Sequence, residues 1–192
     1  MAGLALRRAA ILLALLPTLA TGCGDSRTPV LGFGAPAPPN GFKLVHYPAA
    51  GISFLAPKGW KTQPQRAPLV TVVASGPAVV SVWRFARSQP LPSTQAAVAH
   101  AGAALIRAAH ARDATLQLIR SRALTLGGAP AVEVDAYEHI GNQLRRVRSI
   151  HLFAFGAEIV LDEYAPPSVF HAVDHAVFSP LKRSLRLAPS QA

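Results

Sequence analysis

Short apolar runs separated by turn residues dominate residues 43–85, the first part of the chain with a regular pattern of apolar and polar positions. They are rich in β-branched and aromatic side chains, and Gly or Pro flanks each of them. Such runs are typical of β-strands. The predicted strands cover residues 43–47, 52–55, 69–75 and 78–85. Gly76-Pro77 separates the last two and favours a tight connection, so we expect an antiparallel meander.

The pattern changes to a helical period after Pro90-Leu91-Pro92. Apolar residues recur at Val98, Ala101, Leu105 and Ala109, which places them on one face of a helix. We expect this helix to run from Ser93 to about residue 111, with Ser93 as its N-cap. The face consists mostly of small side chains, so the helix can pack close to a sheet.

The second half carries the clearest strand pattern. Val132, Val134 and Ala136 alternate with polar residues, as expected for a strand with one apolar face. Turns predicted at Gly141-Asn142 and Gly156-Ala157 divide the following sequence into strands over residues 144–155 and 159–164. Three long antiparallel strands therefore follow one another.

A second amphipathic helix is predicted after Pro166-Pro167-Ser168. Its apolar stripe consists of Phe170, Val173, Val177 and Leu181, with Phe178 at the edge. Pro180 either kinks the helix or restarts it with Ser179 as the cap. Strands, helix, strands and helix, without regular βαβ alternation, predict an α+β domain in which two main helices cover an antiparallel sheet.

Two short motifs and their order along the chain carry a family resemblance. Ile52-Ser53-Phe54 leads into Pro57-Lys58-Gly59-Trp60, and Leu126-Gly127-Gly128-Ala129-Pro130-Ala131 precedes the long hairpin. With the closing helix, this pattern resembles the PsbP-like α/β/α sandwich proteins over roughly residues 43–187, and among them it is most similar to actinobacterial lipoproteins of the LpqN type. The resemblance implies a binding or accessory module without a common active site, so it supplies no catalytic residue.

The N-terminus resembles a bacterial lipoprotein signal peptide. Arg7 and Arg8 precede an apolar stretch too short to span a bilayer, and small residues lead to Cys23, the only cysteine. In that family the peptidase cuts before the cysteine, which carries the lipid. An ordinary cleaved signal peptide and a short membrane anchor are the alternatives. The lipoprotein interpretation predicts a lipid anchor at Cys23 and a location on the outer face of the cell membrane.

The sequence thus divides into four parts. Residues 1–22 are the predicted signal peptide, and residues 23–41 are the lipidated cysteine and a flexible tether rich in Gly and Pro. Residues 42–188 form the predicted PsbP-like domain. Residues 189–192 are a tail that we expect to be disordered.

Charge provides the main candidate for a binding site. The formal net charge is +10, and it falls to +8 without Arg7 and Arg8. Strand alternation places Arg120 with Arg122 on one face, and Arg146 with Arg148 on one face. If those faces coincide, four guanidinium groups could bind an anionic envelope component or an envelope protein. The alternative, which we favour from the sequence, is a solvated basic surface above anionic lipid. Without aromatic interleaving, we expect no nucleic acid partner.

Recognisable catalytic or metal motifs are missing from the sequence. It contains no Gly-x-Ser-x-Gly, Ser-x-x-Lys or His-Glu-x-x-His pattern. His171 and His175 have metal-ligand spacing but no evident third ligand, so we interpret them as surface histidines. His139 and His151 come from the two strands of the hairpin and could meet across it, yet neither has a suitable carboxylate nearby in the sequence. We expect no catalytic residue, no metal and no cofactor.

These observations favour a membrane-tethered, non-enzymatic binding or accessory module. One alternative is a carrier of a lipid or other apolar ligand between sheet and helix, which would need a cavity lined by small residues such as Ala101 and Ala108. The other is a hydrolase without a recognisable motif, which a cleft joining a carboxylate, a histidine and a hydroxyl would favour.

Overall fold

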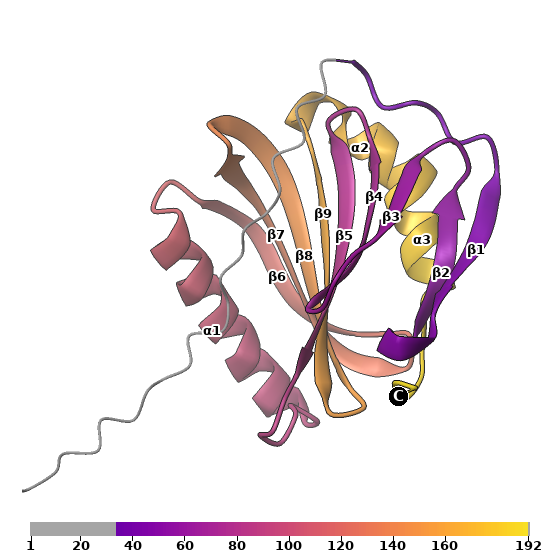
Figure 1. Ribbon diagram of the computed structural model, residues 1–192. Coiled ribbons are helices and arrows are strands. Elements are labelled where there is room, and N and C mark those ends of the chain that lie inside the picture. Colours follow the sequence, from indigo (N-terminus) through magenta and orange to yellow (C-terminus); the bar gives the residue numbers. More distant parts are fainter. Residues whose placement is uncertain (1–33, 192) are drawn as a thin grey trace, which may run out of the picture.

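A seven-stranded antiparallel sheet forms the centre of the computed structural model, which describes residues 34–191. In spatial order its strands are β3 (Lys61–Pro64), β4 (Leu69–Ser75), β5 (Ala78–Ala86), β9 (Ala157–Ala165), β8 (Gln143–Ala154), β7 (Ala129–Ile140) and β6 (Gln117–Leu126). All pairings between neighbouring strands are antiparallel. Strands β7, β8 and β9 follow one another as hairpins, whereas β5 and β9 are far apart in the sequence and pair side by side in the sheet (Figure 1). The predicted antiparallel α+β fold is therefore confirmed.

A small second sheet packs beside the C-terminal helices. Its strands, in spatial order, are β1 (Phe42–Tyr47), β2 (Ile52–Pro57) and β10 (Arg186–Leu187), and the short 3-10 helix η1 (Pro48–Ala50) joins the first two. The inner side chains of β2, such as Phe54, reach the main hydrophobic core. That core lies between this small sheet, the C-terminal helices and one face of the large sheet (Figure 1).

Helix α1 (Gln95–Arg112) covers the opposite face of the large sheet over β6 and β7. Val98 and Ala109 are buried, and Gly102 lies so close to Val132 that an added Cβ would be 3.2 Å from its Cγ1. The predicted small-residue face thus packs close to the sheet. The expected N-cap was wrong by one residue, because the Thr94 hydroxyl, not Ser93, accepts the hydrogen bond from the Ala97 N–H at 3.2 Å.

The closing helix consists of three continuous parts, α2 (Pro167–Val173), the π-helical η2 (Asp174–Phe178) and α3 (Ser179–Ser184). Pro180 lacks an N–H and cannot donate to the carbonyl four residues earlier, which accounts for the wider turn before it. Ser179 does not cap a new helix, since its hydroxyl donates to Asp174. All five apolar residues predicted for the stripe are buried: Phe170, Val173, Val177, Phe178 and Leu181.

One hairpin turn also differs from its prediction. The turn between β8 and β9 uses Phe155 and Gly156, both with positive φ, rather than Gly156-Ala157. This pair forms the two-residue connection whose twist matches the flanking strands. Gly141 and Asn142 form the equivalent turn between β7 and β8, as predicted.

The two ends of the domain are more ordered than the sequence predicted. Ala37 accepts a hydrogen bond from the Trp60 indole at 2.9 Å and donates one to Ser75 at 2.9 Å, so the predicted tether does not extend to Gly41. The buried indole N–H needs a partner, and this Pro-rich segment supplies it at a small entropic cost. At the other end, the Gln191 N–H donates to Pro48, which corrects the predicted disordered tail. None of the helices described within residues 34–191 has the length and apolarity to cross a bilayer.

Candidate functional site

Strands β6 and β8 bring all four predicted arginines to one face of the large sheet. Strand β7 lies between them, and Asp135 of that strand is the common neighbour. Its Oδ2 atom lies 2.8 Å from Arg146, 3.7 Å from Arg120 and 3.9 Å from Arg148. Arg122, two residues further along β6 than Arg120, contacts Glu133 of β7 at 3.0 Å. The faces therefore coincide, as the binding-site interpretation required.

The sequence analysis missed the four carboxylates in this cluster. Glu133 and Asp135 come from β7, Glu163 from β9 and Asp174 from η2, and the first three are almost fully buried. Strand alternation alone could have placed Glu133 and Asp135 on one face of β7. It could not show that this face turns inward, because β7 is covered by α1 on one face and by arginines of β6 and β8 on the other.

Arg148 is at the centre of the cluster and is only 5% exposed. It donates two hydrogen bonds to Asp174, at 2.6 and 3.0 Å, and one to Glu163 at 3.3 Å. Its guanidinium also lies 5.2 Å from the centroid of the Phe170 ring, and that of Arg146 lies at 4.6 Å. Burial opposes the charged form, but these carboxylates outweigh it and raise the pKa of Arg148 further. Arg148 is therefore a buried structural cation.

The two carboxylates that face Lys182 respond differently to burial. Burial would raise the pKa of Asp174, but hydrogen bonds and charge from Arg148 and Lys182 outweigh it and lower the pKa to about 2. Glu163 is completely buried, and burial raises its pKa to about 7 despite Lys182 at 3.2 Å and Arg148 at 3.3 Å. Its Oε1 atom has no hydrogen-bond partner. The charge of the cluster thus changes near neutral pH.

A hollow of about 260 Å³ opens beside this cluster, and we call it the basic pocket. Its lining residues are Arg120, Arg122, Leu124, Leu126, Glu133, Arg148, Asp174, Ser179, Lys182 and Arg183. The cluster and the pocket together hold six cationic groups, the five of the lining plus Arg146, against the four carboxylates described above. A formal excess of two positive charges remains in this described part of the chain.

Exposure differs between the two predicted arginine pairs. Arg120 and Arg122 on the edge strand β6 are 47% and 53% exposed, whereas Arg146 is 25% and Arg148 5% exposed. Buried carboxylates hold the guanidiniums of the second pair in fixed positions. Only the outer pair, with Arg183, presents N–H groups to solvent at the pocket.

The opposite face of the sheet holds a hydroxyl, a histidine and a carboxylate in a chain. The Ser149 hydroxyl lies 3.1 Å from His151 Nε2, and His151 Nδ1 lies 2.5 Å from Glu158. Sequence reasoning missed Glu158 as a partner because it comes from the next strand. Burial would raise the pKa of Glu158, but His151 and Arg87 outweigh it and lower the pKa.

The series of contacts from Ser149 through His151 to Glu158 lacks two features of a nucleophilic triad. The hydroxyl proton of Ser149 is directed to Asp162 at 2.5 Å, and a carboxylate is a stronger acceptor than an imidazole. The hollow beside Ser149 has a volume of only about 50 Å³, too small for a substrate acyl group and its leaving group. We therefore assign no catalytic role to Ser149 and do not propose the hydrolase.

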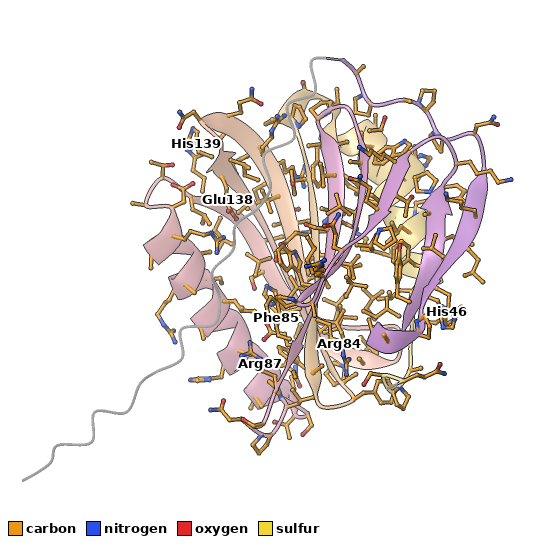
Figure 2. The ribbon with its side chains drawn as sticks, viewed as in Figure 1. His46, Arg84, Phe85, Arg87, Glu138 and His139 are labelled. Atoms are coloured by element: carbon orange, nitrogen blue, oxygen red, sulfur yellow. The ribbon has the colours of Figure 1, made fainter. Side chains whose placement is uncertain are left out.

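The remaining histidines do not gather into a site. His139, labelled in Figure 2, contacts Thr115 at 2.9 Å near the loop after α1. It does not meet His151, because His139 pairs with Leu144 across the hairpin and His151 pairs with Val132. His171 and His175 are exposed, as predicted for surface histidines. Within residues 34–191 no group of three His, Cys, Asp or Glu side chains is arranged to hold a metal ion. Cys23, the predicted lipidation site, lies outside the described residues.

A wider groove runs along α1, and its walls include small side chains. Its volume is about 420 Å³, and Ala101, Ala104 and Ala108 form the helical wall. Leu91 and Phe153 also line the groove, together with the paired Arg87 and Glu158. This is the position at which the sequence analysis required a cavity for an apolar ligand.

Comparison with solved structures identifies the fold. The solution structure of cyanobacterial PsbP (CyanoP) from Synechocystis sp. PCC 6803 is similar with a TM-score of 0.60 at 15% sequence identity, over 82% of this chain and 96% of that chain. The crystal structure of LpqN, which is involved in cell envelope biogenesis of Mycobacterium tuberculosis, gives a TM-score of 0.49 at 16% identity, over 77% and 91%. No protein-family model and no curated protein matches the sequence. The likeness to CyanoP confirms the PsbP-like fold that the sequence motifs predicted.

Proposed function

We propose that this protein is a membrane-tethered accessory module outside the cytoplasm, and that it binds an anionic envelope component in the basic pocket. The excess of cationic groups over carboxylates around this pocket is the observation that carries the proposal. The anion is a phosphate or carboxylate group, because planar guanidinium groups recognise such oxygens through paired N–H donors.

The buried carboxylates support binding rather than oppose it. Glu133 and Asp135 hold the arginine side chains of β6 and β8 in place, so an arriving anion meets donors that are already oriented. Arg183 lines the pocket from α3 and forms no side-chain ion pair with any described residue. Its guanidinium is therefore available to an anion.

The tether rests on the sequence around Cys23. The small residues before that cysteine fit the recognition sequence of a lipoprotein signal peptidase, and a lipid chain on Cys23 would keep the module at the membrane surface. The positive charge of the domain adds attraction to anionic lipid.

Anchoring is tested by the Cys23→Ser variant. We expect the protein to leave the membrane fraction or to remain uncleaved, because the lipid acceptor is gone. Fractionation and intact mass measurement provide the readout. A cleaved Cys23→Ser protein that stays in the membrane fraction would exclude the lipid anchor.

Anion binding is tested by calorimetric titration of the purified protein with sulfate at constant ionic strength. The variant Arg120→Ser/Arg183→Ser removes two cations of the pocket. Its buried carboxylates stay paired, because Glu133 still has Arg122 as a partner and Asp135 still has Arg146. We expect sulfate affinity to fall about tenfold or more, since two charge-assisted contacts are removed.

A control for net charge is available elsewhere on the surface. Arg66 and Arg107 are exposed and do not line the basic pocket, so Arg66→Ser/Arg107→Ser removes the same charge. We expect that variant to bind sulfate as the wild type does. Equal losses in both double variants would show general attraction by charge and contradict the pocket.

A second candidate function is the transport of an apolar ligand, and the groove along α1 is the observation that favours it. Replacing Ala104 by Trp would fill the groove from the helical side. If the protein is a carrier, lipid extracted from the wild type after purification should be absent from Ala104→Trp. Equal lipid content in both proteins would exclude this groove as the binding site.

A further inference from the structure

A second groove of about 470 Å³ lies at the open end of the main core, away from the basic pocket and from α1. Its lining residues are His46, Tyr47, Pro48, Ala49, Ala50, Pro64, Gln65, Ala67, Pro68, Leu69, Val70, Arg84 and Ala86. They come from β1, η1, β5, the end of β3, the start of β4 and the segment that connects β3 to β4. Figure 2 shows His46 and Arg84 on this side of the molecule, at the end where the small sheet approaches the large one.

The walls of this groove are mostly apolar and continue into the core. Tyr47, Ala50 and Val70 pack against the main core while they also line the groove. Three prolines add rigid apolar surface. A hydrocarbon chain placed here would therefore contact side chains that are already fixed by packing, which reduces the entropic cost of binding.

Arg84 is the unusual residue in this apolar setting. It follows Val80 and Val82 on the same face of β5, so its guanidinium projects where an aliphatic side chain would continue the core. Its Nη2 atom donates to the Phe155 carbonyl at 3.2 Å and to Ser190 at 3.5 Å. Its Nη1 atom is buried and has no hydrogen-bond partner. A buried guanidinium donor without a partner costs free energy and requires an explanation.

Arg84 also differs from the buried arginines of the cluster, Arg146 and Arg148, in having no counter-charge among the described residues. Arg146 and Arg148 each contact carboxylates, whereas no described carboxylate lies within ion-pair distance of Arg84. The groove lining contains Arg84 and His46 and no Asp or Glu. An anionic group in the groove would supply both the missing acceptor and the missing charge.

We infer that this groove binds a small amphiphile of the fatty-acid class, with its carboxylate on Arg84 and its chain along Tyr47, Leu69 and Val70. The volume lies within the range of small-molecule sites, roughly 300 to 1,000 Å³. A carboxylate can accept two N–H bonds from one guanidinium, and a rotation of the Arg84 side chain toward the groove would bring Nη1, which is closed to solvent in this structure, to the second oxygen. His46, exposed at the rim, offers a second donor.

Photolabelling of the full chain in amphipol tests this inference. The probe is a decanoic acid that carries a diazirine on its chain, and the comparison probe is its primary amide. We expect the acid to label peptides within residues 46–50 and 64–70. Arg84→Gln should reduce labelling by the acid about tenfold or more. The amide should label these peptides of the wild-type protein as weakly as the acid labels those of Arg84→Gln.

Two further variants make the result decisive. Arg107→Gln removes an exposed arginine on α1 and should label as the wild type does. Ala86→Trp fills the groove beside Arg84 from an exposed position, so it should also abolish labelling, and it keeps the test valid if Arg84→Gln does not fold. Labelling that Ala86→Trp does not reduce, equal labelling by acid and amide, or labelling confined to residues 90–108 along α1 would each overturn the inference.

Discussion

At the scale of single residues, the buried carboxylates determine what the basic pocket can do. Glu133, Asp135 and Asp174 fix the guanidiniums of the arginines around them. Glu163 is different, because it is completely buried and its pKa is about 7. Near neutral pH a single proton on Glu163 changes the local charge beside Arg148 and Lys182.

The pH dependence of stability should report this proton. Burial raises the pKa of Glu163 from 4.5 to about 7, so the folded state binds the proton more tightly than the unfolded state. The resulting stabilisation is complete below pH 4.5 and is lost as the pH rises to about 7. Glu163→Gln cannot titrate, so its stability relative to the wild type should increase across this window.

Urea unfolding at pH 5 and pH 8 measures the effect. We expect the difference in unfolding free energy between Glu163→Gln and wild type to favour the variant more at pH 8 than at pH 5. A difference that is the same at both pH values would show that Glu163 does not titrate in this range.

The same residues show how much of the candidate site the sequence could reveal. Alternation along β6 and β8 correctly placed each arginine pair on one face, since that depends only on the local period of a strand. The carboxylates of β9 and η2 approach through pairing and helix packing, which are not local. The sequence therefore predicted four of the six cations but neither Lys182 and Arg183 nor the burial of Arg148 among acids.

At the scale of elements, apolar periodicity was a reliable guide and polar elements were not. The long strands β7, β8 and β9 and both amphipathic helices lie where the pattern predicted them. Strand β3 was missed, because Lys61–Pro64 is an edge strand with mostly exposed polar residues and no apolar alternation. Helix boundaries depended on single capping hydrogen bonds, as Thr94 shows.

The cap of α1 can be tested by substitution at two adjacent positions. Thr94→Ala removes the acceptor for the Ala97 N–H and should lower the unfolding free energy by about 1 kcal/mol. Ser93→Ala should change it by less than about 0.5 kcal/mol, as for an ordinary surface position. Chemical denaturation of both variants provides the measurement. A larger loss for Ser93→Ala than for Thr94→Ala would assign the cap to Ser93 after all.

The closing helix should be sensitive to a charge on its buried stripe. Val177 is 1% exposed, so Val177→Asp places a carboxylate in the core without a partner and should cost about 3 kcal/mol or more. The melting temperature should fall by roughly 10 °C. Ala172→Asp is the matched control, because Ala172 is exposed on the same helix. A melting temperature of Val177→Asp within a degree or two of the control would contradict the packing described here.

At the scale of the whole molecule, the two faces of the large sheet carry different chemistry. The α2 and α3 side presents charged groups around the basic pocket. The α1 side presents a mostly apolar groove whose lining includes the Arg87–Glu158 ion pair. The proposed accessory function follows from the basic pocket, and the lipid anchor would place that pocket near other envelope components.

Anomalous diffraction from crystals soaked in selenate tests the central claim most directly. Selenate has the shape and charge of sulfate, and its selenium atom identifies the anion without ambiguity. The account predicts a selenium peak in the basic pocket, within hydrogen-bond reach of Arg120, Arg122 or Arg183. Selenium peaks at other surface arginines, with none in the basic pocket of a crystal that leaves it open to solvent, would contradict it.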